Sequence, residues 1–184
     1  LVNNLHHAPL PTPLWRNDAL DALVGTEVWV KRDDMTSGAA AGNKLRKLEY
    51  LLGEAQARGA TVVLTCGAAQ SNHARATAIA ARELGMRAVL LLMTQSGQPP
   101  EPAGGNLLLD FMVGAELRFI THAQYQQRDA LMKQAARGLA ASGERPYVIP
   151  MGGSNGLGAL GYLDAMREVR EQLDRGLGGG PSGF

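Results

Sequence analysis

The sequence predicts an α/β fold in which helices cover both faces of an open parallel sheet, giving three αβα layers. Strand-like and helix-like segments alternate along the chain, as they do in such folds. The segments 61–65 and 87–92 are short and largely apolar, which is typical of strands covered on both faces. With 184 residues, of which 45% are hydrophobic and 19% charged, the chain can bury a core of that kind.

The predicted elements follow one another in a regular order. The first strand candidate is 27–31, whose residues alternate in polarity. A helix over 43–58 begins after a loop and ends at Gly59, a residue that commonly closes helices. The remaining elements are strand 61–65, helix 71–84, strand 87–92, helix 106–113, strand 117–120, helix 122–141, strand 147–150 and helix 158–174.

Composition excludes several classes of partner. The net charge is only +1, so the protein has no strong positive electrostatic field that would attract nucleic acid or an anionic membrane surface. No apolar run of 18 residues is present, so no spanning helix is expected, and the N-terminal segment does not have the pattern of a signal peptide. With Cys66 as its one cysteine, the chain cannot form an internal disulfide, and we expect a cytoplasmic protein. The start without Met and the Gly-rich end suggest a fragment.

In open parallel sheets, ligands bind where the loops after the strands converge. Three loops therefore become candidates for a site: 66–72, 93–105 and 151–158. The helix start at 43–47 is a fourth, because it carries Lys44 and Lys47 one turn apart. Cations at a helix N-terminus are disfavoured by ~0.3–1 kcal/mol, so their position needs an explanation.

Two readings of these lysines stay open. They could be solvated surface residues. Alternatively, Lys44 offers a neutral amine for Schiff-base chemistry, and Lys47 faces an anion held by the helix start.

The loop sequence GAAQSNHAR, at 67–75, is unusually rich in polar side chains. Ser71 and Asn72 are good helix caps, and capping alone would explain them. Together with Gln70 and His73, however, they form a cluster of donors suited to a carboxylate or a phenolate.

The glycines of MGGSNGLG, at 151–158, have two readings. They either make a flexible turn or allow backbone N–H groups to approach a ligand. Their spacing is not that of a dinucleotide-binding fingerprint, which argues against an NAD-binding domain. The pair Asp33–Asp34 is expected to be solvated or to cap a turn, and no metal site is predicted.

Three motifs in order point to a known family. The runs K-R-D-D at 31–34, G-N-K-x-R-K-L-E at 42–49 and Q-S-N-H at 70–73 closely resemble the 1-aminocyclopropane-1-carboxylate deaminase/D-cysteine desulfhydrase family. These enzymes depend on pyridoxal 5'-phosphate and share the tryptophan synthase β-like fold, fold type II. The resemblance extends from Pro11 to the helix around 158–173. It implies pyridoxal phosphate as cofactor, a small amino acid as substrate and, as a possibility, a homodimer.

The resemblance also implies roles for individual residues. Lys44 matches the lysine that holds the cofactor as an imine, Lys47 a lysine that pairs with its phosphate, and Asn72 the asparagine that hydrogen-bonds its 3′-oxygen. Ser71 matches a serine with a catalytic and substrate-binding role. The implied substrate-binding set is Gln70, Ser71, His73, Gly152 and Gly153.

The implied reaction is elimination of a β-substituent, as in a D-cysteine desulfhydrase that forms pyruvate, ammonia and sulfide. The alternatives are 1-aminocyclopropane-1-carboxylate deaminase, L-cysteate sulfo-lyase and, in another class, a truncated non-catalytic fragment. The family's phosphate loop, tyrosine and acid would lie beyond Phe184, and Ala41 replaces a usual glycine. The implied domain division is 1–36 and 151–184 in a large domain, with 37–150 as a small domain.

Overall fold

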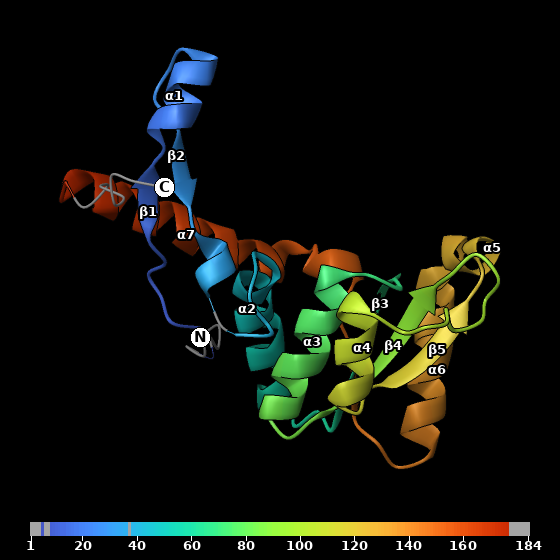
Figure 1. Ribbon diagram of the computed structural model, residues 1–184. Helices are drawn as coiled ribbons and strands as arrows, with labels where there is room; N and C mark the ends of the chain where they lie inside the picture. The colour runs from blue at the N-terminus through green and yellow to red at the C-terminus, as the bar shows by residue number, and fades with distance from the viewer. Residues whose placement is uncertain (1–4, 6–7, 37, 177–184) are drawn as a thin grey trace.

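The computed structural model describes residues 5, 8–36 and 38–176. Figure 1 shows the main sheet and its helices on the right, with a long C-terminal helix crossing to the left beside a small strand pair. In chain order the elements are β1 (Leu14–Arg16), α1 (Asp18–Val24), β2 (Trp29–Lys31), η1 (Asp33–Met35), α2 (Lys44–Ala57), β3 (Val62–Ala68), α3 (Asn72–Glu83), β4 (Arg87–Met93), α4 (Gly105–Met112), β5 (Glu116–Ile120), α5 (His122–Gln126), α6 (Arg128–Ala141), β6 (Pro146–Val148), η2 (Met151–Gly153) and α7 (Gly156–Asp174).

The main sheet has the strand order β5-β4-β3-β6, and every neighbouring pair is parallel. The two central strands pair along their whole length, from Val62 opposite Arg87 to Ala68 opposite Met93. The carboxyl ends of the strands therefore meet at one edge. This arrangement confirms the predicted open parallel sheet.

Alternate residues of the central strands face different helix layers. Val63, Leu90 and Leu92 pack in a core with apolar residues of α2, α3 and α4. Leu64 and Leu91 point the other way and pack with Met132 and Leu139 of α6. Because side chains alternate along a strand, this division confirms the predicted three layers.

Helix α3 owes its close fit to small side chains. Its buried alanines surround most of its circumference, so it can lie near the sheet and near α2 and α4 at once. The buried alanines are Ala74, Ala76, Ala78, Ala80 and Ala81. Helix α2 in turn packs along α7. Helix α2 therefore lies between α3 and α7.

Two predicted elements are wrong in part. The strand over 27–31 does not join the main sheet, because β2 pairs antiparallel with β1 in a separate two-stranded sheet. The helix over 122–141 is interrupted at Gln127, whose φ of −102° and ψ of 19° leave the helical region. The N–H of Gln127 bonds the carbonyl of Gln124 and closes α5 early.

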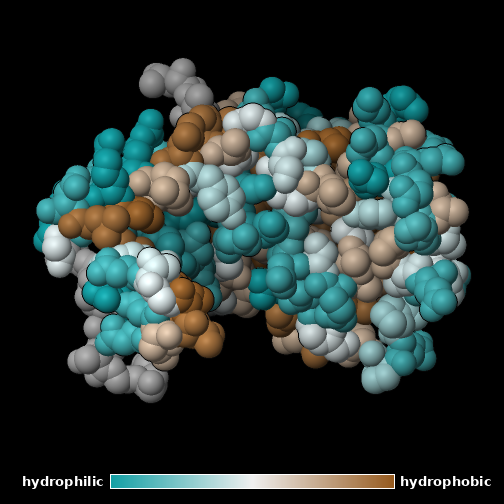
Figure 2. Space-filling view, turned by 90° about the horizontal axis from the view of Figure 1, so that it is seen from above, coloured by the Kyte–Doolittle hydropathy of each residue, from teal (hydrophilic) through white to brown (hydrophobic). Residues whose placement is uncertain are grey.

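Apolar side chains remain exposed on α7. Leu163, Met166 and Leu173 are 54%, 63% and 44% exposed. Brown side chains gather on the left of Figure 2, the part of the molecule that holds α7 and the β1–β2 pair. Within residues 5, 8–36 and 38–176, no helix is long and apolar enough to cross a membrane.

Candidate active site

Lys44 is the first residue of α2, and the loop before it determines its position. Gly42 has a φ of +128°, which side-chain-bearing residues rarely adopt, and its carbonyl accepts from the N–H of Leu45 at 3.1 Å. Asn43 is in the helical region, and its side chain makes no capping hydrogen bond to the start of α2. The guanidinium of Arg75 holds this loop through the Ala41 carbonyl at 2.8 Å.

Lys47 lies one turn further along and is half-buried. Its Nζ donates to Ser154 Oγ at 2.9 Å and lies 5.6 Å from the centre of the Tyr162 ring. Partial burial and the nearby positive charge of Lys44 lower the pKa of Lys47 below its ordinary value. Two lysines close enough to interact in this way would be stabilised by a shared anion.

Ser71 caps α3 at the carboxyl end of β3. Its Oγ accepts from the N–H of Ala74 at 3.1 Å, which confirms the capping interpretation and leaves the hydroxyl hydrogen for another acceptor. Gly67 makes room for this cap, because a Cβ at Gly67 would lie 2.5 Å from Ser71 Oγ. The serine is therefore fixed at the mouth of the strand–helix turn.

The neighbouring polar residues are tied to the start of α4. Asn72 Oδ1 accepts from Asn106 Nδ2 at 2.8 Å. The side chain of Gln70 donates to the Gly104 carbonyl at 3.0 Å and accepts from the backbone N–H of Asn106 at 2.9 Å. Gln70 and Asn72 thus lie at the predicted site, at the carboxyl end of β3, and part of their hydrogen-bonding capacity is already used.

His73 lies behind this edge and is only 3% exposed. Its Nε2 is 2.9 Å from Thr65 Oγ1, whose hydroxyl donates to the Ile149 carbonyl. Burial, followed by the charges of Lys44 and Lys47, lowers the pKa of His73 to about 4. The imidazole is therefore neutral near pH 7, and it lies within electrostatic range of both lysines.

Gly152 and Gly153 bring the third loop against α2. Both have positive φ angles, of 65° and 62°, and this conformation favours glycine. A Cβ at Gly153 would lie 3.0 Å from Leu51 and 3.4 Å from the Cβ of Lys47. The loop thus runs beside Lys47, and its next residue, Ser154, supplies the hydroxyl that Lys47 contacts.

Three residues near the site have no assigned role in the sequence interpretation. Ser154 and Tyr162 contact Lys47, and Asn106 contacts Asn72. Ser154 lies inside the Gly-rich loop already singled out, so that loop was a signal for it. Tyr162 and Asn106 are more than thirty residues from their partners, and local pattern carries no information about such contacts.

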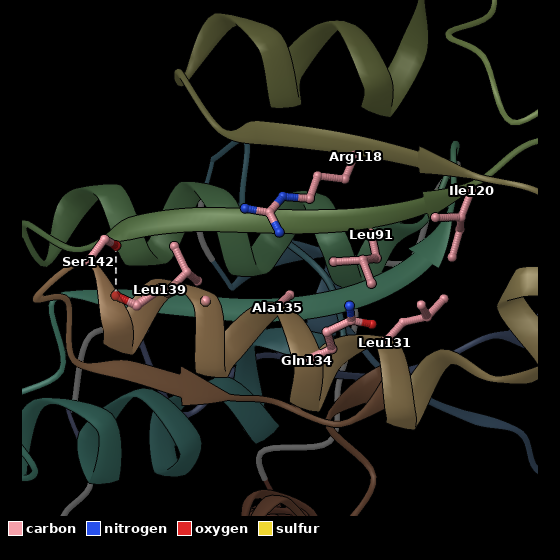
Figure 3. A pocket seen from close by; sticks show the side chains of 9 residues that line it. Leu91, Arg118, Ile120, Leu131, Gln134, Ala135, Leu139 and Ser142 are labelled. Carbon is pink, nitrogen blue, oxygen red and sulfur yellow. Dashed lines mark hydrogen bonds between the residues drawn. The ribbon is translucent and has the colours of Figure 1, made fainter.

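An open groove of about 540 Å³ lies against α6, on the face of the sheet opposite to α2 and α3. Figure 3 shows apolar side chains such as Leu91 and Leu131 around it, with Arg118 at its rim. Arg118 already pairs with Glu116, and the lining includes no carboxylate, histidine, lysine or thiol. Across the described part of the chain, no group of three or more potential metal ligands occurs. The groove and the metal-ligand search therefore give no alternative to the site around Lys44 and Ser71.

Comparison with known proteins decides the family. The family model described as pyridoxal-phosphate dependent enzyme matches residues 5–181. The chain belongs to this family. Its cofactor, pyridoxal phosphate, is the one predicted from the sequence.

The relatives carry the names expected from the motifs. A putative 1-aminocyclopropane-1-carboxylate deaminase of Thermotoga maritima is 46% identical over 164 residues, covering 89% of this chain and 51% of that protein. A bifunctional, mitochondrial D-cysteine desulfhydrase/1-aminocyclopropane-1-carboxylate deaminase of Arabidopsis thaliana is 44% identical over 171 residues, covering 91% and 43%. The predicted resemblance is therefore confirmed.

A solved structure confirms the fold. The crystal structure of a 1-aminocyclopropane-1-carboxylate deaminase homologue superposes with a TM-score of 0.82 at 39% identity. The match covers 92% of this chain and 51% of that one, and it agrees with the predicted fold type II architecture. This chain spans about half the length of the relatives it matches.

Proposed function

We propose that the protein eliminates the β-substituent of a small amino acid, in the manner of a D-cysteine desulfhydrase. With D-cysteine and water, the products would be pyruvate, ammonia and sulfide. One observation carries the proposal: Lys44 and Lys47 share one helix turn within electrostatic range of His73, which lies next to Ser71 and Asn72 at the start of α3. An amine and a second cation suit an aldehyde that carries a phosphate.

Each residue has a separate task in this proposal. Lys44 holds the cofactor through its ε-amine and carries the proton removed from the substrate. Lys47, supported by Ser154, faces the phosphate, and Asn72 donates to the 3′-oxygen. When bound, pyridoxal phosphate supplies the electron sink that makes loss of the α-proton possible.

The substrate carboxylate is assigned to the loop after β3. Ser71 keeps a hydroxyl hydrogen for it, since its oxygen already accepts from Ala74. Gln70 contributes the amide hydrogen left after its bond to Gly104, and the loop Gly152–Gly153 borders the substrate. We assign His73 an indirect part, because it is buried and bonded to Thr65.

A second candidate reaction is ring opening of 1-aminocyclopropane-1-carboxylate, an activity that appears in the names of the Thermotoga maritima and Arabidopsis thaliana relatives. It would use the same Lys44 and Ser71.

Three further assignments accompany the proposal. We assign the protein to the cytoplasm, consistent with its free buried Cys66. We also propose a homodimer, in which the second subunit would cover the exposed apolar face of α7. We also keep the division into a small domain at 37–150 and large-domain segments at 1–36 and 151–184.

The proposal is tested by adding pyridoxal phosphate to the protein expressed from its whole open reading frame. The visible absorption band of the bound cofactor is recorded for the wild type, Lys44→Ala and a control, Lys133→Ala. Lys133 is exposed on α6, across the sheet from the site. Borohydride reduction and peptide mapping then identify the modified lysine, and pyruvate and sulfide are measured with D-cysteine.

We expect the band and the products in the wild type and in Lys133→Ala, and neither in Lys44→Ala. A band that survives in Lys44→Ala would disprove the assignment of Lys44. A band without products from D-cysteine or from 1-aminocyclopropane-1-carboxylate would instead support a non-catalytic protein.

A further inference from the structure

The loop after β3 and the start of α4 are joined by a closed set of hydrogen bonds around Asn106. The Nδ2 group of Asn106 donates to the backbone carbonyl of Gln70 at 2.9 Å and to Asn72 Oδ1 at 2.8 Å. Its backbone N–H donates to Gln70 Oε1 at 2.9 Å, and Gln70 Nε2 donates to the Gly104 carbonyl at 3.0 Å. Four hydrogen bonds thus connect two segments that lie 34–36 residues apart in the chain.

The close approach of these segments depends on a glycine. Gly105 has a φ of +58°, and a Cβ there would lie 2.6 Å from Gln70 Oε1. A side chain at this position would therefore displace Gln70 and open the set of bonds. The backbone conformation at Gly105 thus holds Asn106 beside Gln70.

The set has a defined polarity, and a backbone group sets it. The carbonyl of Gln70 can only accept, so the part of the Asn106 amide that faces it must be the NH₂ group. The second hydrogen of that NH₂ points to Asn72, so the atom it meets must be the carbonyl oxygen of the Asn72 amide. The NH₂ group of Asn72 is then left on the other side, and no described residue accepts from it.

We propose that Asn106 is a positioning residue that orients the amide of Asn72 so that its NH₂ group is presented to the 3′-oxygen of pyridoxal phosphate. This inference rests on the proposed function, which places Asn72 at that oxygen. The 3′-oxygen is an acceptor with anionic character. An Asn72 free to turn would present its carbonyl oxygen part of the time, and two acceptors would then repel each other.

The test compares two ligands that differ only at the 3′-oxygen. Dissociation constants of pyridoxal phosphate and of its 3-deoxy analogue are measured by fluorescence titration with the protein from its whole open reading frame. The variants are Asn106→Asp and Asn106→Ala. Asn17→Asp serves as the control, because it makes the same chemical change at the distant cap of α1, where Asp also caps well.

In Asn106→Asp the new carboxylate cannot donate, and it would accept from Asn72 Nδ2, which turns the Asn72 carbonyl toward the ligand. We expect the affinity for pyridoxal phosphate to fall about tenfold or more and the affinity for the 3-deoxy analogue to stay unchanged. Asn106→Ala adds no charge and is expected to show the same selectivity to a smaller extent. Asn17→Asp is expected to bind both ligands as the wild type does.

Equal losses for the two ligands, in variants whose circular dichroism matches the wild type, would show a merely structural role and overturn the inference. Unchanged binding of both ligands would overturn it as well. Failure of the proposed function has a different signature: the wild type itself would not bind pyridoxal phosphate, or Asn72→Ala would bind it with undiminished affinity.

Discussion

Gly161 of α7 packs directly on the backbone of Arg46 in α2, so closely that a Cβ on Gly161 would overlap the Arg46 carbonyl oxygen and crowd the N–H of Lys47 at 3.1 Å. The contact lies on the turn of α2 that carries Lys44 and Lys47. The distance between the two helices therefore fixes both lysines relative to the Gly152–Gly153 loop, which is joined to α7.

Gly161→Ala is expected to destabilise the fold by about 2–3 kcal/mol, because the obstacle is backbone and can move only if the helices separate. Urea unfolding followed by circular dichroism measures the change. Gly138→Ala is the matched control: Gly138 lies in α6 with nothing within 4 Å of its Cβ position. Alanine there should stabilise the protein by about 0.5–1 kcal/mol. Similar effects of the two substitutions would contradict the close contact.

Arg46 is expected to be indispensable for stability because it is a buried cation with several partners. It is 1% exposed, and it pairs with Asp33 at 2.7 Å and with Glu168 at 2.9 Å. Removing the cation takes the Arg46 partner from Asp33 and leaves Glu168 with Lys31, and both acids have little access to water. Arg46→Met should therefore cost about 3–5 kcal/mol of unfolding free energy. Thermal and urea unfolding at pH 7 measure it.

The control for Arg46 is Arg58→Met. Arg58 is 66% exposed and pairs with Glu54 on the same helix, so its loss should change stability by less than about 0.5 kcal/mol. If Arg46→Met were as mild as this control, the buried network would not contribute to stability.

The sequence predicted those parts of the fold that depend on local pattern. Strand β3 and helix α2 were placed within a residue or a few, because a continuous apolar run and a helical apolar stripe are properties of neighbouring residues. The β1–β2 pair was missed as a pair, since three-residue strands carry little pattern and their partner is set by tertiary contact.

The site divides in the same way. Lys44, Ser71 and Asn72 were proposed as site residues because sequence motifs contain them, whereas Asn106 was only the first residue of a predicted helix. Its bond to Asn72 depends on the approach of α4 to α3, which folding alone creates. The burial of His73 could not be predicted from the sequence either, because its direct neighbour Asn72 is exposed and local pattern does not separate the two residues.

His73 makes stability depend on pH in mildly acidic solution. Burial lowers its pKa from 6.5 to about 4, so between these values the unfolded chain binds a proton that the folded chain does not. The free energy of unfolding therefore keeps its full value, as far as His73 is concerned, above pH 6.5, and it decreases as the pH falls toward 4. Unfolding free energies across this range should show a weaker loss in His73→Gln. His122→Gln, at an exposed histidine, should retain the loss, and equal slopes in both variants would contradict a neutral His73.

Asp110 acts in the opposite sense. It is fully buried in α4, and both its carboxylate oxygens lack a partner among the described residues. Burial raises its pKa to about 7, although the charge of Arg75 on α3 opposes the shift. Between pH 3.8 and 7 the folded chain keeps a proton that the unfolded chain releases. This group therefore destabilises the fold increasingly as the pH rises through that interval, and its effect is constant above it.

Asp110→Asn keeps the shape of the side chain and removes the ionisation. The variant should be about 2–4 kcal/mol more stable than the wild type at pH 8, and the advantage should shrink toward zero near pH 4. Urea unfolding at a series of pH values measures the difference directly, so the opposite contribution of His73 cancels in the comparison. Asp174→Asn, at an exposed acid near the end of α7, should show no such trend. A stability difference for Asp110→Asn that does not vary with pH would mean that Asp110 is already ionised in the folded protein at pH 4.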